Sequence, residues 1–400
     1  MKILYIANEL ADQAATAAQV RVRALLPILQ ANAELRVIAF PPQGVPLPEA
    51  SASGIDNVQF VPRRDMGGPA LVRATFCSTP RAFRRFDTPN VRAVLAKSLA
   101  EHRPDIVHFD GFATLGLLDF VANASPSSAL VAHIHDAQSA RIKPFTRHGS
   151  LAARMQTTLE YFKALAFEKK KLDRADLVLV DSSEDRDYLR AITGCDHVHT
   201  LPIGFDPTVF AATGSTVALA QPAIVYSGSM GAKQSVDGAL FLAHEVMPLV
   251  WKKHPNAHLY IVGGGPTEDV RTLDGAKVHV TGFVDDLAAY LRAATVYVCA
   301  LRLGSGMRTR VIEALACGTT MVATPISVRG LDELDARAPW ILADTADDFA
   351  AGIEKVLDNG APQLAKEASD FAFSSFAWDT IAKRLIDLYH EKCMPGRNHG

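Results

Sequence analysis

The feature of this sequence that most constrains its fold is a repeated alternation of short apolar segments with longer segments of helical periodicity. In the first half, the apolar runs predict strands at 2–7, 35–40, 106–109, 130–134 and 177–180. Because helical segments separate these runs, consecutive strands are expected to pair in parallel. The chain therefore predicts the α/β class, with a doubly wound parallel sheet whose ligands bind at the carboxyl ends of the strands.

The same alternation begins again in the second half, with strands predicted at 223–226, 259–262, 278–281, 296–300 and 320–323. The stretch 201–221 between the halves is rich in proline, glycine and small residues. Because 400 residues exceed what one hydrophobic core usually serves, we expect two α/β domains facing a cleft, at 1–205 and 206–378. A helix and tail at 379–400 follow, and one option is that they pack back on the first domain.

The composition excludes several classes of protein. A formal net charge of -2 argues against nucleic acid as a partner. The five cysteines are scattered without a CxxC pair, so neither a disulfide framework nor a zinc site is indicated. The start of the chain has only five consecutive apolar residues, and no later run approaches the roughly 20 needed to span a bilayer. A cytoplasmic location is therefore expected.

The charge is unevenly distributed, and the segment 63–103 is strongly basic. It holds nine basic and three acidic residues, with Phe76, Phe83 and Phe86 interleaved. Two interpretations are open: a basic, partly aromatic surface that rests on anionic lipid, and a solvated helix face. The first would place the protein at the inner face of a membrane as a peripheral protein.

The segment 301–324 predicts a loop, a helix and a buried strand in immediate succession. The Gly-Ser-Gly at 304–306 permits a tight turn, and a helix is expected at 307–317. The unpaired N–H groups and the positive dipole end of such a helix favour a bound phosphate. The alternative is that the nearby arginines are simply solvated. The residues concerned are Arg302, Arg308 and Arg310, with Glu313 placed one turn further to bind hydroxyls attached to the phosphate.

Other common sites are not indicated by the sequence. The first βα turn, at Asn8, has no glycine, and the glycines at 263–265 do not give the G-x-G-x-x-G spacing of dinucleotide sites. The Asp-Arg-Asp at 185–187 resembles a metal-binding Asp-x-Asp, but Ser182 or Ser183 before it predicts a capped helix start. No metal site is therefore assigned.

Several motifs together resemble the retaining GT-B glycosyltransferases of family 4. In the second half these are YSGSM from Tyr226, YIVGGGP from Tyr260, VTGFVDDLAAYL from Val280 and GSGMRTRVIEALACGTTMVAT from Gly304; in the first half HIHDAQSAR from His133, LVLVDSS from Leu177 and LPIGFD from Leu201 are weaker matches. The resemblance implies an acceptor-side domain followed by a nucleotide-sugar-binding domain, both Rossmann-like. It also implies a metal-independent hexosyltransferase whose nucleotide-diphosphate-sugar is a substrate, with no cofactor.

The resemblance also implies roles for individual residues. The donor-binding residues would be Gly228 at the phosphates, Glu313 at the ribose, Gly282, Phe283 and Val284 at the base, and Ser305, Gly306, Met307 and Arg310 in the loop and helix start. His135 would lie near the hydroxymethyl group of the donor sugar and, with Lys233 and Arg308, forms the expected catalytic set.

The sequence departs from the family pattern at three places. Ser305 stands where the first of two glutamates is usual, and Ser229 and Gln234 stand where an arginine and a lysine usually grip the phosphates. In addition, Ala15, Ala17 and Ala18 replace an N-terminal Gly-Gly loop. Lys233 and Arg308 are expected to supply the missing charge. Arg310 is expected to face solvent or another domain, since residues two apart on a helix face different sides.

The expected function is transfer of a sugar, with retention of configuration, to a hydroxyl of a growing glycan. The acceptor partner would be a glycan or a lipid-linked glycan of a surface polysaccharide. Two alternatives remain open: a nucleotide-sugar epimerase of the same fold, and a non-catalytic two-domain sugar-binding protein.

Overall fold

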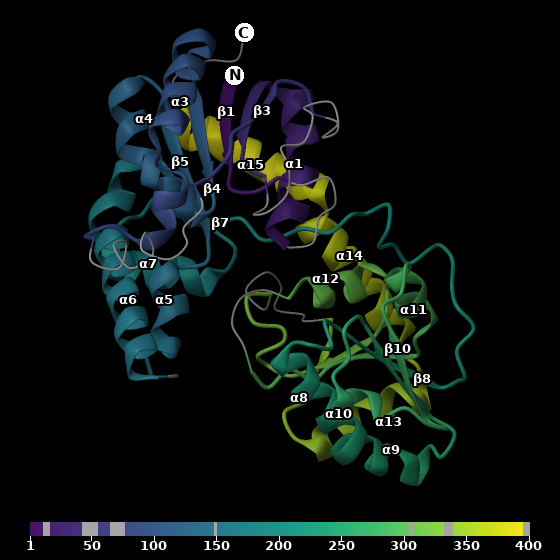
Figure 1. Cartoon of the computed structure of the whole chain (residues 1–400). Coiled ribbons are helices and arrows are strands. Elements are labelled where there is room, and N and C mark those ends of the chain that lie inside the picture. Colours follow the sequence, from purple (N-terminus) through teal and green to yellow (C-terminus); the bar gives the residue numbers. More distant parts are fainter. Residues whose placement is uncertain are drawn as a thin grey trace. The chain divides into compact units, whose positions relative to one another are not determined.

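The computed structural model describes residues 1–10, 17–41, 55–64, 77–147, 150–303, 308–331 and 339–394. These residues form two compact units, each built on its own parallel sheet (Figure 1). The first unit is Met1–Pro202 together with the chain from Ile381 onward, and the second is Ile203–Thr380. The predicted α/β class with two parallel sheets is confirmed.

The first sheet has the strand order β3-β2-β1-β4-β5-β6-β7, and every neighbouring pair is parallel. Its strands are β1 Lys2–Ala7, β2 Glu34–Ala39, β3 Val58–Phe60, β4 Ile106–Asp110, β5 Ala129–His135, β6 Leu177–Val180 and β7 Val198–Thr200. Its main helices are α1 Ala17–Asn32, α3 Pro89–His102, α4 Leu118–Ala124, α5 Gln138–Ile142, α6 Leu151–Lys171 and α7 Ser183–Thr193, with 3-10 segments η2 Arg81–Arg85, η3 Phe112–Leu117 and η4 Lys143–Arg147.

The second sheet has the order β10-β9-β8-β11-β12-β13, again with parallel pairs throughout. Its strands are β8 Ala223–Ser227, β9 His258–Val262, β10 Val278–Gly282, β11 Val296–Cys299, β12 Met321–Ala323 and β13 Ile341–Leu342. Its helices are α8 Lys233–Phe241, α9 Met247–Lys253, α10 Glu268–Arg271, α11 Leu287–Ala293, α12 Thr309–Ala316, α13 Ala346–Asn359 and α14 Pro362–Phe376; α15 Trp378–Leu388 then leads into a π-helical turn, Tyr389–Cys393.

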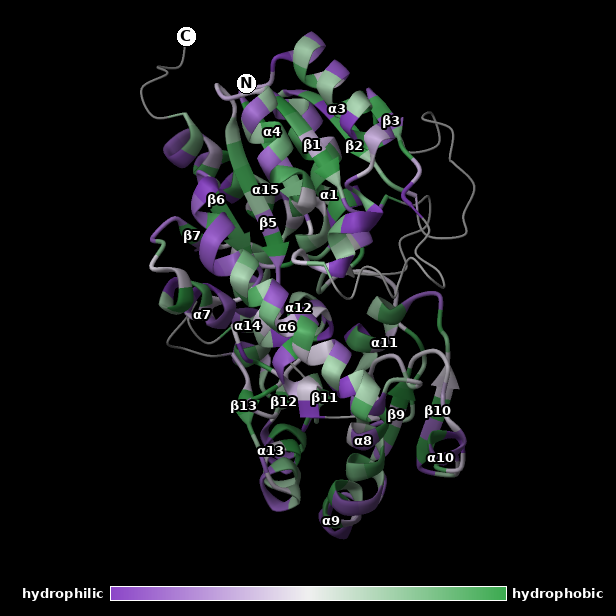
Figure 2. Cartoon of the chain, turned by 60° about the vertical axis from the view of Figure 1, so that its left-hand side comes forward, coloured by the Kyte–Doolittle hydropathy of each residue, from purple (hydrophilic) through white to green (hydrophobic). Residues whose placement is uncertain are grey.

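The central strands are apolar on both faces, as expected where helices cover both sides of a parallel sheet. In β1 the five residues from Ile3 to Ala7 are fully buried, and the strands of this sheet are coloured mainly as hydrophobic in Figure 2. Within the described residues, no helix is long and apolar enough to cross a membrane.

Strand order reverses between β1 and β4 in the first sheet and between β8 and β11 in the second. At such a switch point the loops leaving two adjacent strands turn to opposite sides, which opens a crevice at the carboxyl ends. Each unit therefore has one preferred place for a ligand.

The ten predicted strands are all present, each within one residue of the expected bounds. Three strands were not predicted: β3, β7 and β13. All three are two- or three-residue strands at sheet edges, too short to carry a periodic signal. The Asp-Arg-Asp segment does begin a helix, because the Ser182 side chain accepts a hydrogen bond from the Asp185 N–H and caps α7.

The expected aromatic surface at 63–103 is wrong for the two phenylalanines that the structure describes. Phe83 is 4% exposed and packs on Phe112 and Phe167, while Phe86 is 2% exposed and packs edge-on against Phe40. Both rings therefore belong to the core. Phe76 lies outside the described residues.

Three loops at the carboxyl edge of the second sheet are joined through their backbones. The Gly228 N–H donates to the Val262 carbonyl at 3.0 Å, and the Gly263 N–H donates to the Gly282 carbonyl at 3.0 Å. Gly263 has φ +145°, and a Cβ placed on it would lie 1.8 Å from the Gly228 carbonyl oxygen. The close approach of the β8 and β9 loops thus depends on a glycine at position 263.

We expect Gly263→Ala to destabilise the second unit by about 2 to 4 kcal/mol, through backbone strain and overpacking. Urea unfolding followed by tryptophan fluorescence measures this unit, since Trp251, Trp340 and Trp378 all lie within it. Gly264→Ala is the matched control, because the nearest atom to its Cβ would be 3.6 Å away. Equal stability of the two variants would contradict the expectation.

Candidate active site

Arg310 lies at the switch point of the second sheet. From the second position of α12 its Nη1 donates to the Ser227 carbonyl at 2.9 Å and to the Ser235 hydroxyl at 3.3 Å. A Cβ on Gly228 would lie 2.3 Å from this Nη1. The guanidinium is therefore held directly against the loop that leaves β8.

The expectation that Arg310 faces solvent or another domain is wrong. The helix α12 begins at Thr309, later than expected, and Arg308 is its capping residue with extended backbone, φ -107° and ψ 101°. Arg308 and Arg310 are therefore not two residues of one helix, and the argument from helical spacing does not apply. Arg310 reaches the end of β8 and the start of α8.

The two serines that accept hydrogen bonds from Arg310 are each held by a tyrosine through their other polar group. The Tyr297 and Ser227 hydroxyls are 3.0 Å apart, and the Tyr226 hydroxyl donates to the Ser235 carbonyl at 3.1 Å. Burial raises the pKa of both the Tyr226 and the Tyr297 hydroxyls well above the usual value, so both remain protonated near pH 7. The position of Arg310 is thus set before any ligand arrives.

Glu313 follows Arg310 by one helical turn on α12. Burial raises the pKa of the Glu313 carboxyl to about 7, although the Arg310 guanidinium opposes the shift. At neutral pH this carboxyl is close to half-ionised. A group of this kind can accept hydrogen bonds from hydroxyls, which suits the ribose role that the resemblance implies.

The other predicted donor-binding residues lie around the same edge where they are described. Lys233 is the first residue of α8 and is exposed, and Gly282 ends β10 in the left-handed region with φ +69°. Phe283 is 79% exposed and Val284 is half-buried. Three predicted residues lie outside the described residues: Ser305, Gly306 and Met307.

Arg302 does not join this group. Its guanidinium makes a two-bond ion pair with Asp237, at 2.8 and 2.9 Å, and lies 4.6 Å from the ring centre of Phe241. Its charge is thus already paired, in contrast to the expectation that it would add charge at the start of α12.

The first unit has a buried charged cluster at the corresponding edge of its sheet. The Arg21 Nη2 donates to Asp181 Oδ2 at 2.6 Å, and its Nη1 lies 3.3 Å from His133 Nε2 and also contacts His135 Nδ1. The other ring nitrogen of His135, Nε2, lies 3.4 Å from Asp110 Oδ1. These residues come from α1 and from the ends of β4, β5 and β6, so the parallel sheet gathers them.

Opposing charges set the protonation of this cluster. Burial and Arg21 disfavour a charged His135, but Asp110 and Asp181 outweigh them and raise its pKa to about 9. Burial lowers the pKa of His133 to about 4, so this ring is neutral. Burial of Asp110 is outweighed by His135, His133 and Arg21, which lower its pKa to about 2. His135 also has φ +65°, a conformation that few non-glycine residues adopt.

Aromatic rings pack against the buried side of the cluster. His108 stacks on Tyr5, with ring centres 4.4 Å apart, and its Nδ1 lies 2.6 Å from the Tyr389 hydroxyl. Burial holds the pKa of His108 well below its usual value, so the ring is neutral and accepts that hydrogen bond at Nδ1. Tyr389 belongs to the π-helical turn after α15, so the end of the chain contributes to this site.

Several buried polar atoms of the cluster make no hydrogen bond to any described residue. They are Asp110 Oδ2, His133 Nδ1, His108 Nε2 and the Tyr5 hydroxyl, while Asp110 Oδ1, His135 Nε2 and Asp181 Oδ1 make only ion-pair contacts of 3.4 to 3.6 Å. Most buried polar groups in proteins have a partner, and exceptions gather where a ligand binds. The arrangement is typical of a substrate-facing site.

Two overlapping triads here have ligand atoms within 4.8 Å of one another, His108-Asp110-His133 and His133-His135-Asp181. A cation at the second triad would meet the Arg21 guanidinium, which is 1% exposed and already bonds to its members. A permanent positive charge in that place disfavours a metal ion. The cluster therefore fits a neutral, hydroxyl-bearing ligand better than a cation.

A cavity of about 570 Å³ lies at the same edge of the first sheet. Its walls come from the segments that follow β1, β4 and β5, through Asn8, Ala113 of η3 and Gln138 of α5, and from η2 and α6. Arg63 in its wall pairs with Glu9 at 2.8 Å. Two further arginines line the cavity, Arg81 and Arg85, and neither side chain makes an ion pair with a described residue.

Among the residues of the first unit, only His135 was predicted to act in the site. Arg21 was missed because nothing in its local sequence separates it from a solvated helical arginine. Asp110 and Asp181 each end a predicted strand, and this position was the available signal, since parallel strand ends meet at one edge.

Comparison with known proteins gives a consistent family assignment. Residues 221–359 match the family described as glycosyl transferases group 1, and residues 8–204 match the glycosyl transferase 4-like domain. A phosphatidyl-myo-inositol mannosyltransferase of Mycobacterium tuberculosis is 26% identical over 156 residues, which are 36% of this chain and 41% of that protein's length. The MMP alpha-(1->4)-mannosyltransferase of Mycolicibacterium hassiacum is 24% identical over 320 residues, 74% of this chain and 73% of the relative.

Solved structures resemble the whole chain. Sucrose-phosphate synthase from Thermosynechococcus elongatus has a TM-score of 0.67 at 20% identity, with 98% of this chain and 99% of that chain covered. HepE of Anabaena in complex with UDP and glucose has a TM-score of 0.62 at 15% identity, with 98% and 100% covered. At these identities the likeness establishes the fold.

We expect Arg310→Gln to weaken the binding of UDP and GDP, because a charge-assisted contact to the diphosphate is lost. The expected loss is about 1.5 to 3 kcal/mol, or roughly tenfold to a hundredfold in Kd by titration calorimetry. Arg302→Gln is the control, since Arg302 is paired with Asp237. Unchanged affinity in Arg310→Gln, with a large loss in Arg308→Gln or Lys233→Gln, would support the preference drawn from sequence instead.

Glu313 makes the second unit less stable as pH rises. Its folded pKa of about 7 lies above the ordinary 4.5, so the folded state binds more protons between these values and loses stability from about pH 4.5 to pH 7. We expect Glu313→Gln to exceed wild type at pH 8 by about 1 to 3 kcal/mol and to match it at pH 4.5. Tryptophan-detected urea unfolding at both pH values checks this, and a constant difference between the proteins would exclude titration of Glu313 as the cause.

Proposed function

Because the chain belongs to the family-4 glycosyltransferases, glycosyl transferases group 1, we propose that it transfers a hexosyl group from a nucleotide-diphosphate-sugar to an acceptor hydroxyl. The configuration at the anomeric carbon is retained in this proposal. The observation that carries it is the contact of Arg310 with the Gly228 loop at the switch point of the second sheet. A diphosphate leaving group requires positive charge and N–H donors at such a place.

In this proposal the second unit binds the donor. The diphosphate lies against Gly228 and the start of α12, where Arg310, Arg308 and Lys233 offset the charge that develops as it departs. Glu313 accepts hydrogen bonds from the ribose, and the base lies at the loop formed by Gly282, Phe283 and Val284. Since fixed cations stabilise the leaving group, no metal ion is required.

The first unit is proposed to bind the acceptor, and its cavity indicates the acceptor's chemistry. Arg81 and Arg85 line the cavity without ion-pair partners among the described residues. Its one carboxylate, Glu160, is already bonded to Lys163 at 2.8 Å and to the Arg81 backbone N–H at 2.9 Å. The wall therefore has an excess of positive charge. This favours an acceptor whose hydroxyl is carried next to an anionic group, such as the phosphate of a lipid-linked glycan.

His135 keeps the role that the resemblance implies, a hydrogen bond to a hydroxyl of the transferred sugar. The buried contacts to Arg21 and Asp110 would hold its ring in one orientation. The name of the mycobacterial relative also supports the acceptor class, because phosphatidyl-myo-inositol carries its hydroxyls on a lipid phosphate. A peripheral location at the inner face of a membrane follows from an acceptor of this kind.

The decisive experiment is a panel of UDP-, GDP- and dTDP-sugars assayed with lipid-linked and free acceptors. A transferase releases one nucleoside diphosphate for each glycoside formed, and NMR of the product reports the anomeric configuration. Activity should persist in EDTA. Interconversion of free donor sugars without an acceptor would indicate an epimerase, and binding without release would indicate a sugar-binding protein.

Arg81→Gln and Arg85→Gln should each raise the KM for the active acceptor roughly tenfold, since one charge-assisted contact is removed. The KM for the donor should stay within about twofold of wild type, because these residues lie in the first unit. Arg36→Gln, which removes a surface ion pair with Glu101, is the matched control. A neutral acceptor that is used equally well by wild type and both variants would rule out the anionic acceptor class.

A further inference from the structure

The described residues expose ten large hydrophobic side chains, and five of them lie between residues 145 and 162. Their exposed fractions range from 40% to 72%. This segment contains η4 and the first half of α6, which lies beside α5 as a hairpin in Figure 1. The five are Phe145, Leu151, Met155, Leu159 and Phe162, and we call them the α6 apolar face.

The spacing of these residues places them on one side of the helix. Leu151, Met155 and Leu159 are four residues apart and Phe162 is three further, so all four lie within one stripe of α6. The opposite side of α6 packs into the core of the first unit through Ala164, which is 1% exposed, and Phe167. The helix therefore has a second apolar face that its own fold does not use.

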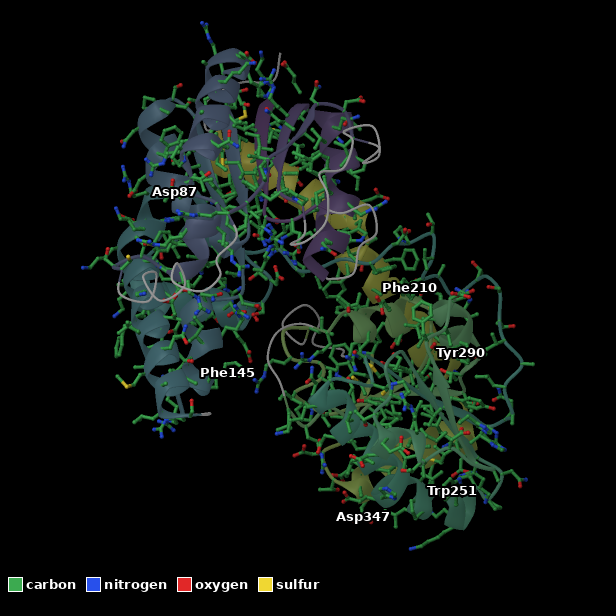
Figure 3. The ribbon with its side chains drawn as sticks, viewed as in Figure 1. Asp87, Phe145, Phe210, Trp251, Tyr290 and Asp347 are labelled. Carbon is green, nitrogen blue, oxygen red and sulfur yellow. The ribbon has the colours of Figure 1, made fainter. Side chains whose placement is uncertain are left out.

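The start of the hairpin continues this surface. Phe145, labelled in Figure 3, is 61% exposed on η4. A hollow of about 410 Å³ lies between η4 and α6, with Pro144, Tyr161 and Phe162 in its wall. Contiguous apolar surface of this kind marks an interaction site on a protein.

The charge around the α6 apolar face is mainly positive, and the one acidic residue between 138 and 162, Glu160, is paired with Lys163 at 2.8 Å. Residues 138–159 contain four basic residues and no aspartate or glutamate. All four are exposed, and none makes an ion pair with a described residue. They are Arg141, Lys143, Arg147 and Arg154.

We propose that the α6 apolar face rests on an anionic lipid bilayer. The apolar side chains enter the headgroup boundary, and the four cations meet the lipid phosphates, as in amphipathic helices that lie in the membrane interface. A second copy of this chain is a poor occupant, because two cationic faces would repel each other. The surface is distinct from the basic segment 63–103, whose described phenylalanines are buried.

The bilayer contact explains how a lipid-carried acceptor reaches the first unit. Three residues of α6, Ala153, Gln156 and Thr157, line the acceptor cavity, while Leu151 and Met155 belong to the exposed stripe. One helix thus borders both surfaces. Delivery of a lipid-carried acceptor to the cavity rests on the proposed function. Binding of the α6 apolar face to lipid does not depend on that function, and the experiment below measures lipid binding without turnover.

The test is co-sedimentation of the full chain with vesicles of phosphatidylcholine, with or without about 30% phosphatidylglycerol. We expect wild type to bind the anionic vesicles, and the double variant Leu151→Ser, Met155→Ser to lower the partition coefficient at least tenfold. Arg147→Glu with Arg154→Glu should lower it similarly on anionic vesicles and leave the weak binding to neutral ones unchanged. Far-UV circular dichroism and the midpoint of thermal unfolding, unchanged in all variants, show that the first unit is folded in them.

The controls separate this surface from others. Val209→Ser with Leu342→Ser removes exposed apolar side chains from the second unit and should change binding less than twofold. Lys97→Glu tests the 63–103 segment in the same way. Wild-type binding by the Leu151, Met155 variant, or an equal loss in Lys97→Glu, would overturn the proposal. Self-association of wild type without vesicles, abolished in the Leu151, Met155 variant, would assign the face to a protein contact and would also overturn it.

Discussion

Every strand pairing in both sheets is parallel, and this constraint places all of the site chemistry. A parallel strand can be followed only by a crossover, so the loops leaving successive strands collect at one edge of the sheet. In the first unit that edge receives Asp110, His135 and Asp181 from three different strands. In the second it receives the loops after β8, β9 and β10, which are tied by backbone hydrogen bonds.

Each unit places an arginine from a helix across this edge. Arg21 of α1 reaches the ends of β5 and β6, and Arg310 of α12 reaches the end of β8. A buried guanidinium is costly unless carboxylates or carbonyls surround it, so its partners are fixed as firmly as it is. The two sites differ in what surrounds the arginine. Carboxylates balance Arg21, whereas carbonyl and hydroxyl oxygens leave the charge of Arg310 available for an anion.

The sequence predicted most of the fold because central parallel strands are apolar on both faces and give continuous signals. It did not predict edge strands such as β3 and β13, which are too short for a pattern. For the site, Gly228 and Glu313 could be named from motifs, but Arg21 and His133 could not, because their importance depends on contacts between distant residues. The argument that set Arg308 against Arg310 assumed that both lie on one helix, but α12 begins at Thr309, two residues later than expected, and a shift of that size changes which side chain reaches a neighbouring strand.

The late position of Tyr389 in the chain affects the order in which the molecule folds during synthesis. The histidine cluster of the first unit is supported by a hydroxyl that lies 281 residues beyond His108 in the chain, after the whole second unit has been made. The second unit is therefore synthesised before the segment that completes the first unit, α15 and its π-helical turn. Until then, the nascent chain exposes the surface under His108 that α15 and its π-helical turn later cover, and this is the surface that chaperones would be expected to shield.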